Sequence, residues 1–122
     1  MSSVQTIEVH TVPAYEVAIG AGVLKTCGAR LKSVLGDCRI AVVTDSRVAP
    51  LYLDAVCESL RSAGFSVCSH VFPAGELNKN FTTLSGILEF LAAAQLTRTD
   101  CVAALGGGVT GDMAGFAAAV YL

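Results

Sequence analysis

The chain has 122 residues, 53% of them apolar and 15% charged, which is typical of one folded domain and not of a disordered chain. Eight Lys and Arg against ten Asp and Glu give a net charge of −2 with no basic stripe, so we expect no nucleic-acid partner. The N-terminal MSSVQTIEVH lacks the features of a secretory signal, and the five cysteines are odd in number and widely spaced, at 27, 38, 57, 68 and 101. Both observations favour a cytoplasmic protein with reduced thiols.

Alternating polar and apolar residues predict two short antiparallel strands, at residues 5–10 and 15–19, linked through Pro13. A helix is expected next, ending at Gly36, with an apolar face formed by Leu24, Cys27, Leu31 and Val34. The β-branched run RIAVVTD predicts a strand. A second helix is expected to start near Pro50 and to stop at Gly64.

The segment FSVCSHVF predicts another strand, and PAGE marks the turn that follows. Asn80 is expected to cap a helix with the sequence NFTTLSGILEFLAAA, and DCVAALG predicts the last strand before a final helix. Residues 101–122 are long enough to imitate a membrane span. Five glycines and Asp112 argue against one, so we expect a buried strand and helix and no membrane partner.

Strand and helix alternate along the chain, and the strands IAVV and CVAAL are apolar throughout. Strands that are apolar on both faces are typical of a parallel sheet covered by helices on two sides. We therefore predict an α/β fold with a doubly wound, mostly parallel sheet, a Rossmann-like variant with an antiparallel N-terminal strand pair. A ligand would bind where the loops gather at the carboxyl ends of the strands.

The first of three unusual loops, TDSRVAP, places Asp45 directly after a buried strand. A carboxylate at this position can accept hydrogen bonds from a ribose diol. It can equally form the turn or cap the next helix, and the sequence leaves both interpretations open.

The second loop, PAGELNKN, contains Gly75, which permits a tight turn. Glu76 and Lys79 lie three residues apart and can work together if the segment begins a helical turn. A solvated ion pair without a ligand role is the alternative.

The third loop, ALGGGVTGD, satisfies the GxGxxG pattern through Gly106, Gly108 and Gly111, between a predicted strand and a predicted helix. Glycines let the backbone approach a pyrophosphate, and a helix N-terminus offers free N–H groups and a positive dipole end. The pattern usually follows the first strand, with an acidic residue about 20 positions later. Here an acidic partner for a ribose would have to be Asp45 or Glu76, while Asp112 either interacts with the helix dipole or contacts a ligand.

Two other kinds of site have no support in the sequence. His10 and His70 are far apart and lack Cys or carboxylate companions at ligand spacing, so we expect no metal site within the chain. GGGVTGD lacks the Lys-Ser/Thr ending of a P-loop, and no nucleophile elbow is present.

Taken together, VVTDSRVAPLY, FPAGELNKN and ALGGGVTGDMAGFAAAVYL resemble the amino-terminal domain of the 3-dehydroquinate synthase family, from about Tyr15 onward. That resemblance implies a shikimate-pathway enzyme that uses NAD and a divalent metal, zinc or cobalt. The family converts 3-deoxy-D-arabino-heptulosonate 7-phosphate (DAHP) into 3-dehydroquinate and phosphate. NAD oxidises a ring alcohol transiently, phosphate is eliminated, the ketone is reduced, and the ring recloses by an aldol step.

The resemblance also implies roles for individual residues. Asp45 would contact the adenosine ribose, and Gly75, Glu76 and Lys79 would form a second cofactor loop. The pyrophosphate and nearby parts of NAD would be held by Gly107, Gly108, Val109, Thr110, Gly111 and Asp112. The family usually has Asp-Gly-Glu where this chain has Ala74-Gly75-Glu76, so one polar contact would be absent or supplied differently.

Family members continue beyond this length with a helical domain that carries the metal ligands and most substrate-binding residues. We therefore expect residues 1–122 to be a truncated NAD-binding α/β domain that is inactive alone, and the full-length enzyme to be a homodimer. The alternatives are the NAD-binding half of another sugar-phosphate cyclase or of a glycerol dehydrogenase-like enzyme, or a stand-alone nucleotide-binding module.

Overall fold

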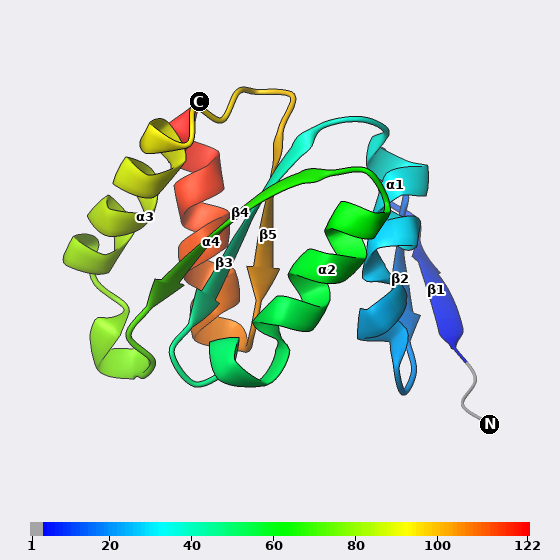
Figure 1. Ribbon diagram of the computed structural model, residues 1–122, viewed down its shortest axis with the longest axis horizontal. Helices are drawn as coiled ribbons and strands as arrows, with labels where there is room; N and C mark the ends of the chain where they lie inside the picture. Colours follow the sequence, from blue (N-terminus) through cyan, green and yellow to red (C-terminus); the bar gives the residue numbers. More distant parts are fainter. Residues whose placement is uncertain (1–3) are drawn as a thin grey trace.

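The structure, a computed structural model, describes residues 4–122. Residues 1–3, the start of the stretch in which we found no secretory signal, lie outside the described residues. Two sheets are present in the described part of the chain (Figure 1). The first pairs β1 (Gln5–Val9) with β2 (Tyr15–Ile19), and the second has the parallel order β4-β3-β5, formed by Ser66–Phe72, Arg39–Asp45 and Cys101–Leu105. The predicted strands, the parallel sheet and the antiparallel N-terminal pair are confirmed.

Four α-helices connect and cover these strands within residues 4–122. They are α1 (Cys27–Leu35), α2 (Asp54–Ser62), α3 (Phe81–Ala93) and α4 (Gly108–Tyr121). Three short helical segments precede α1, α2 and α3, namely η1 (Val23–Thr26), η2 (Ala49–Leu53) and η3 (Glu76–Asn78). The predicted helix near Pro50 therefore starts with an irregular, π-helical turn. Asn80 caps α3 as predicted, because its side chain accepts a hydrogen bond from Thr83 N at 2.9 Å.

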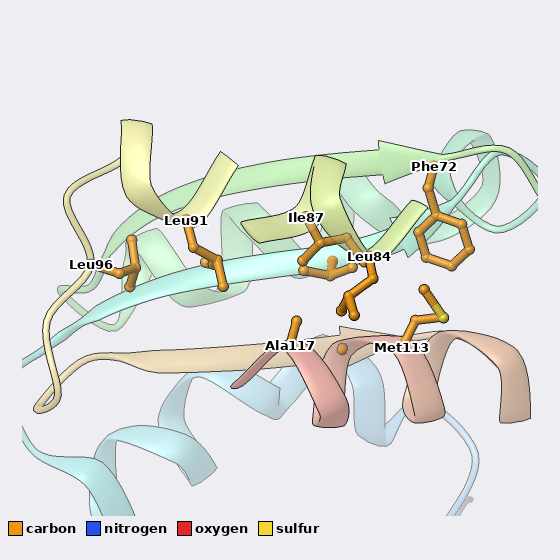
Figure 2. Close-up of a cluster of buried hydrophobic side chains, with 10 residues drawn as sticks. Phe72, Leu84, Ile87, Leu91, Leu96, Met113 and Ala117 are labelled. Atoms are coloured by element: carbon orange, nitrogen blue, oxygen red, sulfur yellow. The ribbon is translucent and has the colours of Figure 1, made fainter. Parts of the chain in front are cut away.

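The central strand β3 is buried on both faces. Its residues Ile40, Ala41, Val42, Val43 and Thr44 are all 0% exposed. Because side chains alternate along a strand, two separate cores form. Ala41 and Val43 join one with α3 and α4, in which Phe72, Leu84 and Met113 come together at one end (Figure 2). Ile40 and Val42 join the other, with α2 and α1.

The path of the chain positions the loops. The connection from β3 to β4 runs through α2 on one face of the sheet, and the connection from β4 to β5 runs through α3 on the other face (Figure 1). From β3 the chain moves to β4 on one side and then crosses to β5 on the other side of β3, so the direction in which the sheet is wound reverses there. In doubly wound sheets a ligand binds at such a reversal, outside the carboxyl ends of the strands. Here the reversal lies between β3 and β5.

Helices α1 and α2 approach closely at Gly28, which is buried. Gly28 N donates to Ser59 Oγ at 3.0 Å, and Ser59 Oγ donates to Lys25 O at 3.0 Å. A β-carbon at Gly28 would overlap the backbone carbonyl of Ser59. This glycine is therefore a packing requirement of the fold.

None of the helices within residues 4–122 combines the length and apolar composition that crossing a membrane requires.

We expect Gly28→Ala to lower the free energy of unfolding by about 1–3 kcal/mol, because the added methyl group overlaps backbone that cannot rotate away. Gly86→Ala is the matched control, since Gly86 is also inside a helix but has no atom within 4 Å of the place where a β-carbon would stand. It should stabilise the protein by about 0.5–1 kcal/mol. Urea unfolding measures both values, and equal effects of the two substitutions would contradict the packing argument.

Candidate functional site

Three loops meet at the carboxyl edge of the parallel sheet. They follow β3 at Asp45, β4 at Phe72 and β5 at Leu105. Thr44 Oγ1 donates to Leu105 O at 2.7 Å and so joins the ends of β3 and β5, and Thr44 is fully buried. The prediction that these loops gather at one edge is confirmed, because parallel strands place all their carboxyl ends on one side of the sheet.

Asp45 uses its two carboxylate oxygens differently. Oδ1 accepts hydrogen bonds from Arg47 N and Val48 N, both at 2.9 Å, so the turn-forming interpretation is confirmed. Oδ2 accepts a hydrogen bond from Thr110 Oγ1 at 3.4 Å, across the gap between the first and third loops. The ribose interpretation stays a prediction, and it concerns Oδ2 alone.

The glycine loop leads directly into α4. Gly106 has φ of +152°, a conformation that side chains rarely adopt, and a β-carbon there would lie 2.8 Å from Thr110 Oγ1. Gly107 is the N-cap and has no side chain to bond the first N–H groups of the helix. Around Gly107, Gly108 and Gly111, apart from the chain neighbours and the helix's own backbone, no protein atom lies within 4 Å of the place where a β-carbon would stand. The backbone at the N-terminus of α4 is therefore open to a ligand.

Such an opening suits an anionic group. The N–H groups of Gly108 and Val109, in the first helical turn, precede the first i→i−4 bond, which Gly111 N makes to Gly107 O at 3.0 Å. Unpaired N–H groups and the positive end of the helix dipole attract phosphate. The space over the glycines is open on this side of the helix N-terminus.

The second loop turns at Gly75, whose φ of +114° favours glycine. Asn78 closes the turn, because its backbone N donates to Gly75 O and its Nδ2 donates to Ala74 O, both at 3.0 Å. Ala74 N donates to Ser46 Oγ at 2.9 Å, which ties this loop to the first. Sequence reasoning had no signal for Ser46, because a serine beside Asp45 looks like an ordinary turn residue.

Lys79 reaches the third loop. Its Nζ lies 2.7 Å from Asp112 Oδ2 and 4.0 Å from Glu76 Oε1, so the expected partner Glu76 is the more distant one. The hydrogen bond and the charge of Asp112 raise the pKa of Lys79. Sequence reasoning missed this pairing because the two residues are 33 positions apart and only the fold brings them together.

Next to this ion pair lies a shallow groove of about 330 Å³ between the N-terminal ends of α3 and α4. The groove is mainly apolar, and Phe81 and Phe116 are 80% and 52% exposed. Its lining consists of Lys79, Asn80, Phe81, Leu84, Asp112, Met113 and Phe116. A larger hollow of about 580 Å³ between α1 and α2 contains no residue of the three loops.

The histidines take no part in this site. His70 lies on β4 and stacks on Phe90 with ring centroids 5.1 Å apart, and burial lowers its pKa. His10 follows β1 and lies 3.9 Å from Glu8. In the described part of the chain, no group of three or more His, Cys, Asp or Glu side chains is arranged to hold a metal ion.

The family model and the curated relatives that the chain matches carry the same family name. Residues 69–122 match the family model described as 3-dehydroquinate synthase N-terminal. The chain is 47% identical over 120 residues to the 3-dehydroquinate synthase of Rhizobium leguminosarum bv. trifolii, covering 98% of this chain and 32% of that protein. It is 45% identical over 108 residues to the 3-dehydroquinate synthase of Streptococcus gordonii, covering 88% and 30%. The chain thus spans about a third of the length of the curated relatives it matches.

Two solved structures share the fold. A 2-deoxy-scyllo-inosose synthase, complexed with carbaglucose-6-phosphate, NAD+ and Co2+, superposes with a TM-score of 0.83 at 24% identity, over 95% of this chain and 31% of that one. A 2-epi-5-epi-valiolone synthase of Streptomyces hygroscopicus, with NAD+ and Zn2+ bound, gives 0.67 at 29% identity, over 75% and 25%.

The sheet order and the loops at its carboxyl edge define a Rossmann-like α/β domain, whose fold is shared with the two solved structures. The sequence relatives narrow this class. The chain belongs to the 3-dehydroquinate synthase family and corresponds to its amino-terminal portion.

We expect Gly106→Ala to destabilise the protein by about 1–3 kcal/mol, because alanine is strained at this φ and its methyl group would press on Thr110. The neighbouring Gly107→Ala serves as the control, since Gly107 has φ of −91° and open surroundings. Its effect should stay within about 0.5 kcal/mol. Thermal unfolding compares the two, and a tolerated Gly106→Ala would show that the loop does not need this conformation.

Proposed function

We propose that this chain is the NAD-binding part of a 3-dehydroquinate synthase, which converts DAHP into 3-dehydroquinate and phosphate. The observation that carries the proposal is the open backbone at Gly107 and Gly108, which lies at the N-terminus of α4 and beside the carboxylate of Asp45. Sequence identity of 47% to a 3-dehydroquinate synthase supports the assignment, and related cyclases with this fold bind NAD+.

In this proposal each loop contacts a different part of the cofactor. The N–H groups of Gly108 and Val109 face the pyrophosphate, and the absence of side chains at Gly107, Gly108 and Gly111 leaves room for it. Asp45 Oδ2 accepts a hydrogen bond from the adenosine ribose. When bound, NAD supplies the hydride acceptor that transient oxidation of the substrate requires.

Asp112 needs a separate explanation, because a carboxylate near a pyrophosphate would repel it. The ion pair with Lys79 at 2.7 Å compensates this charge. Lys79 therefore has two proposed effects: it holds the second loop against α4, and it keeps the site from becoming negative. Gly75 and Glu76 complete the second loop. The Glu76 side chain is 75% exposed at the rim of this loop, where its carboxylate can accept a hydrogen bond from a ribose hydroxyl.

The rest of the enzyme is proposed to lie in the two thirds of the relatives' length that this chain does not span. We place the divalent metal and most substrate contacts there, in a cytoplasmic homodimer. The apolar groove around Phe81 and Phe116 borders the cofactor loops and is proposed as part of the surface that this second domain covers. Residues 1–122 then form the NAD-binding domain.

A second candidate is another sugar-phosphate cyclase, which the fold likeness to 2-deoxy-scyllo-inosose synthase favours. The cofactor loops are compatible with either reaction, because they would contact NAD and not the sugar. Substrate assays on a full-length protein with DAHP and with glucose 6-phosphate separate the two candidates.

We expect Gly108→Val to abolish NAD binding and to leave the fold intact, because the place where its β-carbon would stand is open and the side chain would extend into the proposed pyrophosphate space. Gly115→Val is the control. Gly115 lies in the same helix with equally open surroundings, two turns from the glycine loop. Calorimetric titration with NAD measures affinity, and circular dichroism checks the fold. NAD binding that survives Gly108→Val would rule out the phosphate assignment.

We also expect the purified 122-residue chain to release no phosphate from DAHP, since no metal-binding cluster is present in residues 4–122 and the proposed substrate contacts lie elsewhere. A phosphate assay with added NAD and zinc or cobalt tests this. A full-length relative run in parallel is the positive control. Phosphate release by the chain alone would contradict the proposal that the metal and most substrate contacts lie outside residues 1–122.

A further inference from the structure

We propose that Thr110 is a positioning residue that sets the Asp45 carboxylate for the adenosine ribose and does not touch the nucleotide itself. This inference rests on the proposed function, because it assumes that Asp45 meets a ribose. It changes the role expected for Thr110 from direct contact with NAD to support of another residue.

The first observation is burial. Thr110 is 0% exposed, whereas Gly107, Gly108 and Gly111 around it are exposed. A fully buried side chain cannot form part of the surface that a ligand meets. In the first turn of α4 the Thr110 side chain therefore packs inside the protein and contacts other residues of the site.

The second observation is what Thr110 touches. Its Oγ1 donates to Asp45 Oδ2 at 3.4 Å, joining two loops that are 65 residues apart in sequence. The same hydroxyl lies 2.8 Å from the place where a β-carbon of Gly106 would stand. Thr110 thus fills the space between the glycine loop and the carboxylate, and Gly106 lacks a side chain where Thr110 needs room.

The third observation is the number of acceptor positions on Asp45. Oδ1 already accepts two backbone N–H groups, from Arg47 and Val48, which use its two lone pairs. Oδ2 accepts one hydrogen bond from Thr110 and keeps one lone pair free. Asp45 can therefore accept a hydrogen bond from one ribose hydroxyl while all its bonds to the protein persist. The bonds to Oδ1 fix the orientation of the carboxylate, and Thr110 occupies the other acceptor position of Oδ2, which leaves one position for the ribose.

The bond between Thr110 and Asp45 is long, since O–H···O bonds are usually about 2.7–2.8 Å and this one is 3.4 Å. A long bond is weak by itself, so its effect depends on the surrounding structure that holds the two groups in place. Thr44 Oγ1, bound to Leu105 O at 2.7 Å, holds the two strand ends together so that the carboxylate and the hydroxyl stay within reach.

The experiment measures nucleotide affinity by calorimetry with two probes, ADP and 2′,3′-dideoxy-ADP, which differ only in the ribose hydroxyls. We expect the unsubstituted protein to prefer ADP. Thr110→Val keeps the shape of the side chain and removes the donor, so affinity for ADP should fall about five- to tenfold while affinity for dideoxy-ADP stays the same. Thr110→Ser keeps the donor and should retain the preference for ADP.

A double-substitution cycle with Asp45→Asn tests whether the effect of Thr110 on affinity passes through Asp45. If Thr110 acts through Asp45, Thr110→Val has no further effect on ADP affinity once Asp45→Asn is present. An equal loss for both nucleotides, or an unchanged effect in the Asp45→Asn background, would show that Thr110 acts through packing alone and overturn the inference. Preference for ADP that survives Thr110→Val would also overturn it, with the cofactor assignment intact. Failure of the unsubstituted protein to bind either nucleotide would overturn the cofactor assignment and the inference together.

Discussion

The burial of β3 on both faces is the constraint on which the rest of the structure depends. Five successive residues without solvent exposure require a strand on each side and a helical layer above and below. Fully burying a Val or Ile side chain contributes about 1.5–3 kcal/mol to the stability of the fold, so the burial of this strand also stabilises the sheet. The carboxyl end of this strand also lies between those of β4 and β5, at the edge of the sheet where the candidate site lies.

The three loops at the carboxyl edge of the sheet are linked to one another in a closed circuit. Asp45 and Thr110 join the first loop to the third, Ser46 Oγ and Ala74 N join the first to the second, and Lys79 and Asp112 join the second to the third. Each bond alone is weak, and the exposed ion pair is worth little in water. A closed circuit still limits how the loops move relative to one another. Binding then costs less conformational entropy than ordering three separate loops would.

The sequence was informative where a local pattern determines the structure. The apolar run of β3, the Asn80 cap and the glycines before α4 depend on neighbours a few residues away, and all were predicted. The failures concern contacts between distant positions. Lys79 was expected to work with Glu76, its neighbour in sequence, but its closer partner is Asp112. Gly28 looked like any helical glycine, and only the approach of α2 shows that it is required for packing.

Asp45 illustrates why two competing interpretations of one residue can both hold. A carboxylate in a turn and a carboxylate for a ligand seem to be alternatives when the residue is treated as a unit. Its two oxygens are separate acceptors, and the structure engages Oδ1 fully in the turn and leaves Oδ2 with a free lone pair. The backbone bonds to Oδ1 fix the rotamer, and this fixed rotamer is what directs Oδ2 toward the glycine loop. In this arrangement the structural role is the condition for the proposed binding role.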